Sequence, residues 1–194
     1  MTKKIITTGI LAVAAVALLV LMILGRNNRP VDAAGVRIET SVDSLLPALD
    51  AYGWFNGMPL SYSTEQSYSD SQGTTYYPVT ERFGTYSELS SYIYTVFSPE
   101  ISLHLLSNGA YKDIDGRLCV SPSRSTTTHD DASSIINKEV FTITTQTAGR
   151  IEYVSSVTYV SKTDFDDVKG VYDYHFICEN LNGQFLFTTF EYYY

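Results

Sequence analysis

Hydrophobic and polar positions divide the chain into an apolar N-terminal run and a longer region with shorter patterns. Residues 5–24, IITTGILAVAAVALLVLMIL, contain no charged side chain. Twenty helical residues extend about 30 Å, which is the thickness of the hydrocarbon core of a bilayer. The pattern therefore predicts an N-terminal transmembrane helix, within an anchor or signal segment that covers residues 1–25.

The length of this run bears on whether it is cleaved. The apolar core of a cleavable signal peptide has roughly 7–15 residues, so the longer run favours a retained single-pass anchor. Two lysines precede it and two arginines follow it, so the positive-inside rule gives almost no preference for orientation. We expect a cell-membrane protein whose large domain faces outside. Val31 and Ala33 have the spacing of a signal-peptidase site, and the alternative is secretion after cleavage near Ala33.

A polar tether, residues 26–42, connects the apolar run to a domain that covers residues 43–194. Within this domain, residues 61–77, SYSTEQSYSDSQGTTYY, contain no aliphatic side chain. A segment of this composition cannot form its own core, which predicts a flexible surface loop. Tyrosines among small polar residues are also typical of adaptable binding loops, so the loop is a candidate contact surface.

Helical patterns occupy the first half of the domain. Residues 42–57, VDSLLPALDAYGWFNG, predict one or two short helices that Pro47 interrupts, with the tryptophan and phenylalanine in the core. Thr85 and Glu88 have the spacing of a capping box, which predicts that a helix begins directly after Thr85. Pro99 follows a serine and predicts the start of another helix.

Strand patterns dominate the second half. Segments rich in β-branched and aromatic side chains predict a meander of long antiparallel strands. They are residues 139–147, 150–161, 171–181 and 184–193. In the third segment four side chains share one face, which we expect to be buried. They are Tyr172, Tyr174, Phe176 and Cys178. The predicted class is α+β, with helices packed on a curved, cone-like antiparallel sheet.

The stretch YKDIDGRLCVSPSR raises the question of a metal site. Asp113 and Asp115 would occupy the first and third positions of a calcium-binding EF-hand loop. Arg117 and Arg124 would then occupy the fifth and twelfth positions, where that loop requires an acid or amide and a glutamate. The pair Asp115-Gly116 suits a hairpin turn instead, because glycine accepts positive φ. We predict a turn between two strands here and no metal site.

Charge indicates which partners the domain can bind. All 21 acidic residues lie from Asp32 onward, together with nine of the 13 basic residues, so this part carries a formal charge of 9 − 21 = −12. Such a domain repels nucleic acid and anionic membrane surfaces. The same charge would attract a basic partner, or it serves only for solubility.

Cysteine usage and known motifs give no sign of catalysis. Cys119 and Cys178 lie in apolar segments, where they either form a disulfide in an oxidising compartment or stay free and buried. The sequence contains no C-x-x-C pair, nucleophile elbow, Walker loop or glycine-rich dinucleotide motif. We expect no catalytic residue, no cofactor and no metal.

The order of features in YYPVTERFGTYSELSSYIYTVFSPEISLHLLSNGAYKDIDGRLCVSPSR resembles the DL-endopeptidase inhibitor (IseA) family of exported bacterial proteins. The shared features are an aromatic-proline strand, an F-x-T-x-x-E-L helix start, FS before the second helix and DIDGRL before a polar loop. The resemblance continues to GQFLFTTF and covers roughly residues 76–190. It implies an α+β domain outside the membrane, and founding members of the family bind and block cell-wall-cutting cysteine hydrolases. This chain differs in its membrane anchor and its serine-tyrosine insertion.

These patterns predict a non-catalytic extracytoplasmic binding domain. The resemblance implies that it inhibits or modulates a cell-wall DL-endopeptidase, and the charge of the domain favours a basic one. The alternatives are an NTF2-like small-ligand-binding or enzymatic domain and a structural component of the cell envelope. Candidate contact residues follow from expected exposure and charge. They are Tyr62, Tyr68, Tyr76, Asp113 and Asp115.

Overall fold

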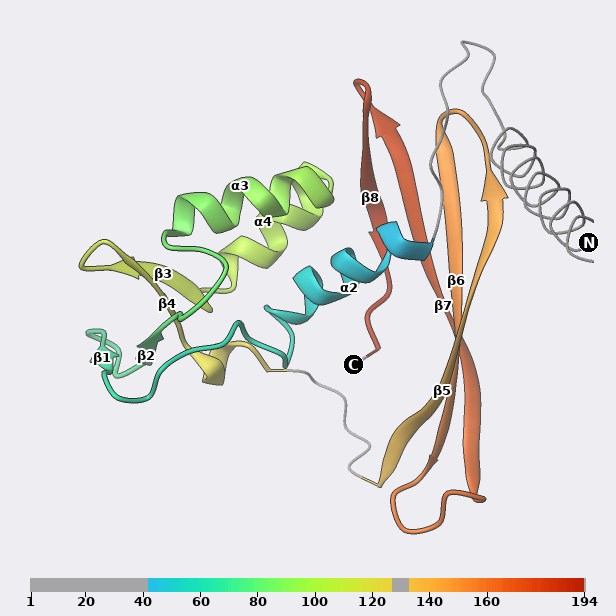
Figure 1. Cartoon of the computed structure of the whole chain (residues 1–194), viewed down its shortest axis with the longest axis horizontal. Helices are drawn as coiled ribbons and strands as arrows, with labels where there is room; N and C mark the ends of the chain where they lie inside the picture. Colours follow the sequence, from blue (N-terminus) through green and yellow to red (C-terminus); the bar gives the residue numbers. More distant parts are fainter. Residues whose placement is uncertain (1–41, 127–132, 194) are drawn as a thin grey trace, which may run out of the picture. The chain divides into compact units, whose positions relative to one another are not determined.

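The computed structural model describes residues 42–126 and 133–193 (Figure 1). The predicted membrane span, the cleavage site near Ala33 and the tether up to residue 41 lie outside these ranges. Within them, no helix combines the length and the apolar composition needed to cross a bilayer. In chain order the elements are η1 (Val42–Ser44), α2 (Leu46–Gly53), β1 (Tyr68–Ser69), β2 (Thr75–Pro78), α3 (Tyr86–Val96), α4 (Pro99–Ser107), β3 (Tyr111–Ile114), β4 (Arg117–Val120), η2 (Pro122–Arg124), β5 (Ser134–Gln146), β6 (Arg150–Ser161), β7 (Val168–Leu181) and β8 (Gln184–Phe190).

The α+β class is confirmed, but the strands form two sheets and not one curved sheet. The antiparallel sheets have the orders β1-β2-β4-β3 and β5-β6-β7-β8. The chain leaves the first sheet at the end of β4, where Ser121 is followed by Pro122 in the short 3-10 helix η2. Proline has no N–H to donate to a ladder, so the first sheet ends here and β5 begins a separate one.

Helix α2 starts in a different way from the one its sequence suggests. Pro47 does not interrupt the helix, because it lies in the first turn, where no intrahelical bond needs its missing N–H. Trp54 and Phe55 are buried directly after the helix, as predicted. A Cβ on Gly53 would lie 2.7 Å from the hydroxyl oxygen of Tyr192. Glycine therefore permits the close approach of the C-terminal segment to this helix.

Helices α3 and α4 begin as their capping signals predict. The Glu88 N–H donates to Thr85 Oγ1 at 3.2 Å, and Glu88 Oε2 accepts the Thr85 N–H at 3.2 Å, which completes the capping box. Ser98 precedes Pro99 and accepts the Ile101 N–H at 3.4 Å. Both helices therefore start with backbone donors that a side chain satisfies.

Two tight turns also match the prediction. Asp115 and Gly116 have φ values of 52° and 75° and connect β3 to β4. Asn182 and Gly183 have φ values of 56° and 92° and connect β7 to β8. Positive φ at both central residues is the geometry of a type I′ turn, which matches the twist of a hairpin.

The stretch predicted as a loop, residues 61–77, is partly strand. It contains β1 and most of β2, which pair with each other. The turn between them is organised by Asp70, whose Oδ1 accepts the N–H groups of Gln72 and Thr74 at 2.9 Å each. Side-chain bonds to the backbone thus order a segment that has no aliphatic residues to bury.

The second sheet is the predicted meander, but two of its strands are longer than predicted and β8 ends at Phe190, short of the predicted residue 193. β5 and β7 begin at Ser134 and Val168, ahead of the predicted residues 139 and 171. On β7, Phe176 is fully buried and Cys178 is 6% exposed, as the alternation predicts. Tyr172 shares that face but is 55% exposed, which contradicts the prediction. Its ring packs edge-to-face against Tyr159 near one end of the sheet and is not enclosed.

Aromatic rings fill the space between α2 and the second sheet. Tyr52 on α2 stacks on Phe190 of β8, with ring centroids 4.8 Å apart, and contacts Phe97 edge-on at 5.9 Å. Phe97 in turn packs against Phe187 and is fully buried. Figure 1 shows α2 lying beside β8, where these rings meet. Among the described residues, the polar ones that are buried are all serines. Two of them, Ser102 and Ser125, donate to backbone carbonyls.

The capping box gives a direct test of the start of α3. We expect Thr85→Ala to lower the free energy of unfolding by about 1 kcal/mol, because the Glu88 N–H loses its acceptor. Urea unfolding followed by circular dichroism measures this change. Ser87→Ala is the matched control, since Ser87 is exposed at the second position of the same helix. Equal unfolding midpoints for the two variants would show that the cap contributes nothing.

Candidate functional site

The five predicted contact residues belong to the first sheet or border it, but they do not form one site. Tyr68 on β1 lies directly opposite Tyr76 on β2, so both side chains are on one face. Tyr62 is bridged to Val79 beyond the end of β2 and contacts the ring of Tyr77, on the other face. The two aspartates lie around the β3–β4 turn. The five residues predicted from the sequence are thus neighbours in the fold, but they lie on different surfaces.

Tyr76 is buried, not exposed as its selection required. Its side chain is 3% exposed, and its hydroxyl donates to the Gly109 carbonyl at 3.1 Å. Lys112 Nζ lies 3.7 Å from the ring centroid and forms an ion pair with Asp70 at 3.4 Å. The ring is therefore occupied by internal contacts, and Tyr76 serves the packing of the first sheet.

The two aspartates differ in what they contact. Asp113 Oδ1 accepts the Tyr86 N–H at 2.6 Å, so its carboxylate lies at the N-terminus of α3, where the helix dipole favours negative charge. Asp115 is exposed at the tight turn. Asp113 therefore has a structural contact of its own, whereas Asp115 faces solvent.

Exposed apolar side chains also lie at the connection between β6 and β7. We call residues 162–169 the β6–β7 tip; in Figure 1 it is the orange loop at the lower end of the second sheet. Phe165 is 62% exposed and Val168 is 57% exposed. Asp164 and Asp166 flank Phe165 and are exposed too. Isolated exposed apolar residues are common, but an exposed phenylalanine beside a second apolar side chain is typical of a contact surface.

The tip has a defined backbone. Asp164 Oδ1 accepts the Asp166 N–H at 3.1 Å, and the Asp164 carbonyl accepts the Asp167 N–H at 3.1 Å. The Asp167 carbonyl in turn accepts the Ser161 N–H at 2.9 Å, and its carboxylate pairs with Lys169 at 2.7 Å. These bonds form a closed turn in which Phe165 projects outward.

Exposed apolar side chains continue from the tip along β7. Val171 is 60% exposed, and the adjacent Tyr172 points to the opposite face. A Cβ on Gly170 would lie 2.7 Å from the Tyr172 ring, so the ring lies against the glycine backbone. The sequence signal for this surface is TDFDDV, an aromatic residue between aspartates in a polar connection. Composition alone indicates a polar connection between two strands and does not reveal this exposed apolar surface.

A second surface feature is an open hollow on the first sheet, with a volume of about 420 Å³. The rings of Tyr62 and Tyr77 lie on one side, with centroids 5.4 Å apart and planes tilted by 31°. The remaining lining residues come from the segment after Tyr62, the β1–β2 turn and η2. They are Thr64, Gly73, Thr74, Thr75, Pro122 and Ser123. Of the predicted contact residues, Tyr62 is the one that lines this hollow.

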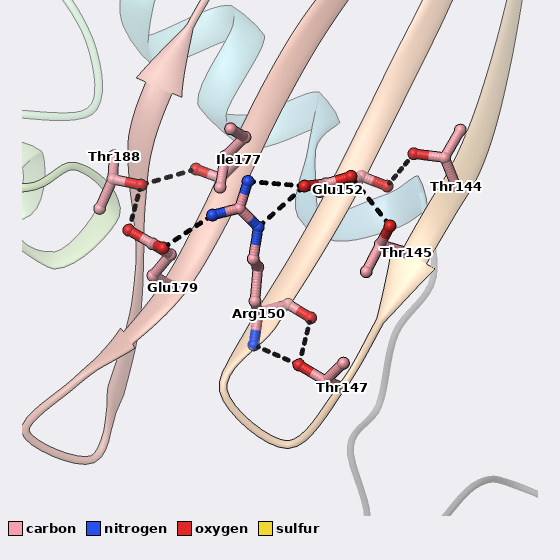
Figure 2. Close-up of polar contacts among 8 residues, drawn as sticks. All are labelled: Thr144, Thr145, Thr147, Arg150, Glu152, Ile177, Glu179 and Thr188. Carbon is pink, nitrogen blue, oxygen red and sulfur yellow. Dashed lines mark hydrogen bonds and ion pairs between the residues drawn. The ribbon is translucent and has the colours of Figure 1, made fainter.

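The solvent-facing side of the second sheet carries a charged network (Figure 2). Arg150 donates through Nε and Nη2 to Glu152 Oε1, at 2.8 and 2.6 Å, and through Nη1 to Glu179 Oε1 at 3.1 Å. The Thr145 hydroxyl donates to Glu152 Oε2, and the Thr188 hydroxyl donates to Glu179 Oε2. The Arg150 guanidinium, followed by the Thr145 hydroxyl, lowers the pKa of Glu152. The network connects neighbouring strands through side-chain hydrogen bonds, and Arg150 favours the ionised form of Glu152.

Both cysteines are enclosed in the core. Cys119 and Cys178 are free and buried, in different sheets. Burial raises the pKa of the Cys178 thiol to about 12 and also raises that of Cys119. Among residues 42–126 and 133–193, no three ligand-type side chains gather into a group that could hold a metal ion.

Comparison with known proteins adds no assignment. No protein-family model matches the chain. No curated protein matches it either.

Buried tyrosines predict how the protein responds to alkali. Burial raises the pKa of six phenols above the ordinary value near 10. They are Tyr52, Tyr86, Tyr111, Tyr153, Tyr159 and Tyr192. An unfolded chain ionises its phenols near pH 10, so their contribution to stability is complete below that pH and is lost as the pH rises further. We expect the urea midpoint to fall between pH 9 and pH 12.

Absorbance at 295 nm measures the same effect directly. Exposed phenols should ionise near pH 10, and the buried group only together with the loss of near-ultraviolet circular dichroism. Tyr94→Phe is the control, because Tyr94 is 44% exposed and its removal should leave the ionisation that accompanies unfolding unchanged. A single transition near pH 10 with the fold intact would contradict the expectation.

Proposed function

We propose that this chain is a non-catalytic binding domain that docks onto a basic protein through the β6–β7 tip. The single observation that carries the proposal is the 62% exposure of Phe165 between two exposed aspartates, on a turn closed by its own hydrogen bonds. Binding hot spots combine a central aromatic residue with a polar rim. The tip has this composition on a small scale.

The backbone of the tip favours affinity. A hairpin end that is ordered before binding loses little conformational entropy when a partner binds. Ser161 N–H, Asp164 and Asp167 hold the turn, and the tip extends directly from two long strands of the second sheet. Phe165 can therefore enter an apolar cleft without a preceding rearrangement.

Charge indicates the type of partner. From Asp32 onward the chain carries −12, and Asp164 and Asp166 place two of these carboxylates beside Phe165. Electrostatic complementarity accelerates association with a basic surface and disfavours acidic ones. A basic protein with an apolar groove fits both features of the tip.

The partner class that fits best is a basic cell-wall DL-endopeptidase, held in check when the tip enters its substrate groove. The support for this class is the resemblance to the DL-endopeptidase inhibitor family together with the expected position of the domain outside the membrane. The turn between β6 and β7 is the part of the tip that would enter a groove that normally receives an extended peptide.

Inhibition of wall lysis tests the proposal. Full-length chain in zwitterionic detergent is added to basic DL-endopeptidases acting on purified cell walls, and the fall in turbidity is recorded. We expect saturable inhibition, and we expect Phe165→Ala to raise the half-inhibitory concentration at least about tenfold, as loss of a hot spot does. Leu103→Ala is the matched control, because Leu103 is 63% exposed on α4 and should leave inhibition unchanged.

A second variant separates the contribution of the two aspartates from that of Phe165. Asp164→Asn with Asp166→Asn should slow association and reduce its dependence on salt, while Phe165 remains in place. Unchanged lysis at saturating protein with several basic hydrolases would refute inhibition. Equal potency of Phe165→Ala and the unmodified chain would refute the tip as the docking element.

A further inference from the structure

We infer that the hollow beside Tyr62 and Tyr77 is a binding site for a neutral oligosaccharide. This inference is independent of the docking proposal, because the hollow belongs to the first sheet and the β6–β7 tip to the second. It depends on the walls of the hollow, on the chemistry of its lining and on the partners that already hold those side chains.

The tyrosine wall is fixed by backbone pairing. Tyr62 faces Val79 in a bridge, and the Ser63 and Thr80 N–H groups donate to the carbonyls of Pro78 and Ser61 at 3.0 and 2.9 Å. These bonds lie on either side of the pair, so Tyr62 occupies a position where opposed side chains come close. Tyr77 is the diagonal neighbour on the same face, and its ring contacts that of Tyr62.

The turn wall is fixed by Asp70. Its Oδ1 accepts the Gln72 and Thr74 N–H groups at 2.9 Å each, and its Oδ2 pairs with Lys112. Gly73, with φ of 79°, has no atom within 4 Å of the position a Cβ would take, so the turn leaves open space at this point. Thr74 and Thr75 therefore present their hydroxyls from an ordered backbone.

The third wall is η2, which directly follows β4. The Ser121 N–H donates to the Ala110 carbonyl at 2.7 Å, and the Arg124 N–H donates to the Ser121 carbonyl at 3.0 Å. Ser123 Oγ shares a hydrogen bond of 3.0 Å with Ser121 Oγ. Because Ser121 is fully buried, Ser123 is anchored to the core while it faces the hollow.

The chemistry of this lining selects the ligand class. Two aromatic rings supply faces for apolar C–H groups, and four alcohols supply groups that both donate and accept. The eight lining residues include no charged side chain, whereas sites for phosphate or carboxylate use arginine or lysine. A sugar ring combines an apolar face with a ring of hydroxyls, and it matches this surface. The volume of about 420 Å³ lies within the ~300–1,000 Å³ range of small-molecule sites.

Arg124 orients one of these alcohols. Its Nη2 donates to Thr74 Oγ1 at 3.2 Å and to Gln72 Oε1 at 3.4 Å. Since the Thr74 oxygen accepts from Arg124, its own hydrogen is directed to another acceptor. The arginine thus makes Thr74 a donor toward a ligand hydroxyl or amide oxygen.

Ligand-observed saturation-transfer NMR tests the inference with the full-length chain, in a detergent without a sugar headgroup. The probes are triacetylchitotriose and maltotriose, with trialanine as the peptide comparison. We expect saturable transfer to at least one saccharide and none to trialanine. Tyr62→Ala should weaken saccharide binding at least about tenfold, and Tyr94→Ala should have no effect, because Tyr94 is exposed on α3.

Two smaller substitutions keep the test valid if Tyr62→Ala unfolds the first sheet. Thr64→Val and Thr75→Val remove one lining hydroxyl each with little change of shape, and each should weaken binding several-fold with an unchanged melting temperature. No saturable transfer to either saccharide would overturn the inference. Equal transfer to trialanine would also overturn the inference and would identify a peptide site. Saccharide binding that none of these substitutions alters would overturn it too, because the saccharide would then bind outside the hollow.

Discussion

The structure depends on the junction at Phe97, where the helical region meets the second sheet. The backbone after α3 forms a parallel bridge with Phe187 on β8, and the Ser98 N–H donates to the Phe187 carbonyl at 2.9 Å. The Phe97 ring is fully buried among Tyr52, Phe187 and Phe190. Full burial of one such ring contributes roughly 1.5–3 kcal/mol, so this cluster is the main apolar link between the two parts.

This junction connects the helical region to the long second sheet. Ser98 has two tasks, since its N–H pairs with β8 and its hydroxyl begins α4. The direction of α4 is therefore tied to the register of β8. β7 and β6 continue from β8 as a meander, and the β6–β7 tip lies at their far end. The position of Phe165 thus depends on strand pairing that the aromatic cluster stabilises.

Helix caps and tight turns were predictable from the sequence, whereas the pairing of distant segments was not. The capping box at Thr85 and the turns at Asp115-Gly116 and Asn182-Gly183 are set by residues a few positions apart, and all three are confirmed. The burial of Tyr76 was not predictable, because it depends on Lys112 and Gly109, more than 30 residues away. For the same reason, the pairing of β2 with β4 in a separate sheet was not predictable from local patterns. The membrane span at residues 5–24 stays a prediction.

The two proposed surfaces differ in how the sequence encodes them. The β6–β7 tip is continuous, so Asp164, Phe165 and Asp166 would keep their chemistry in any hairpin connection, and their exposure supplies the information that composition lacks. The hollow is assembled from three separate segments, and it exists only if Tyr62 pairs beyond β2 while η2 closes the end of β4. Partial unfolding of the first sheet would therefore abolish the hollow and leave the tip intact. Conditions that unfold only the first sheet should therefore remove saccharide binding and leave docking through the tip. A single shared site would lose both together.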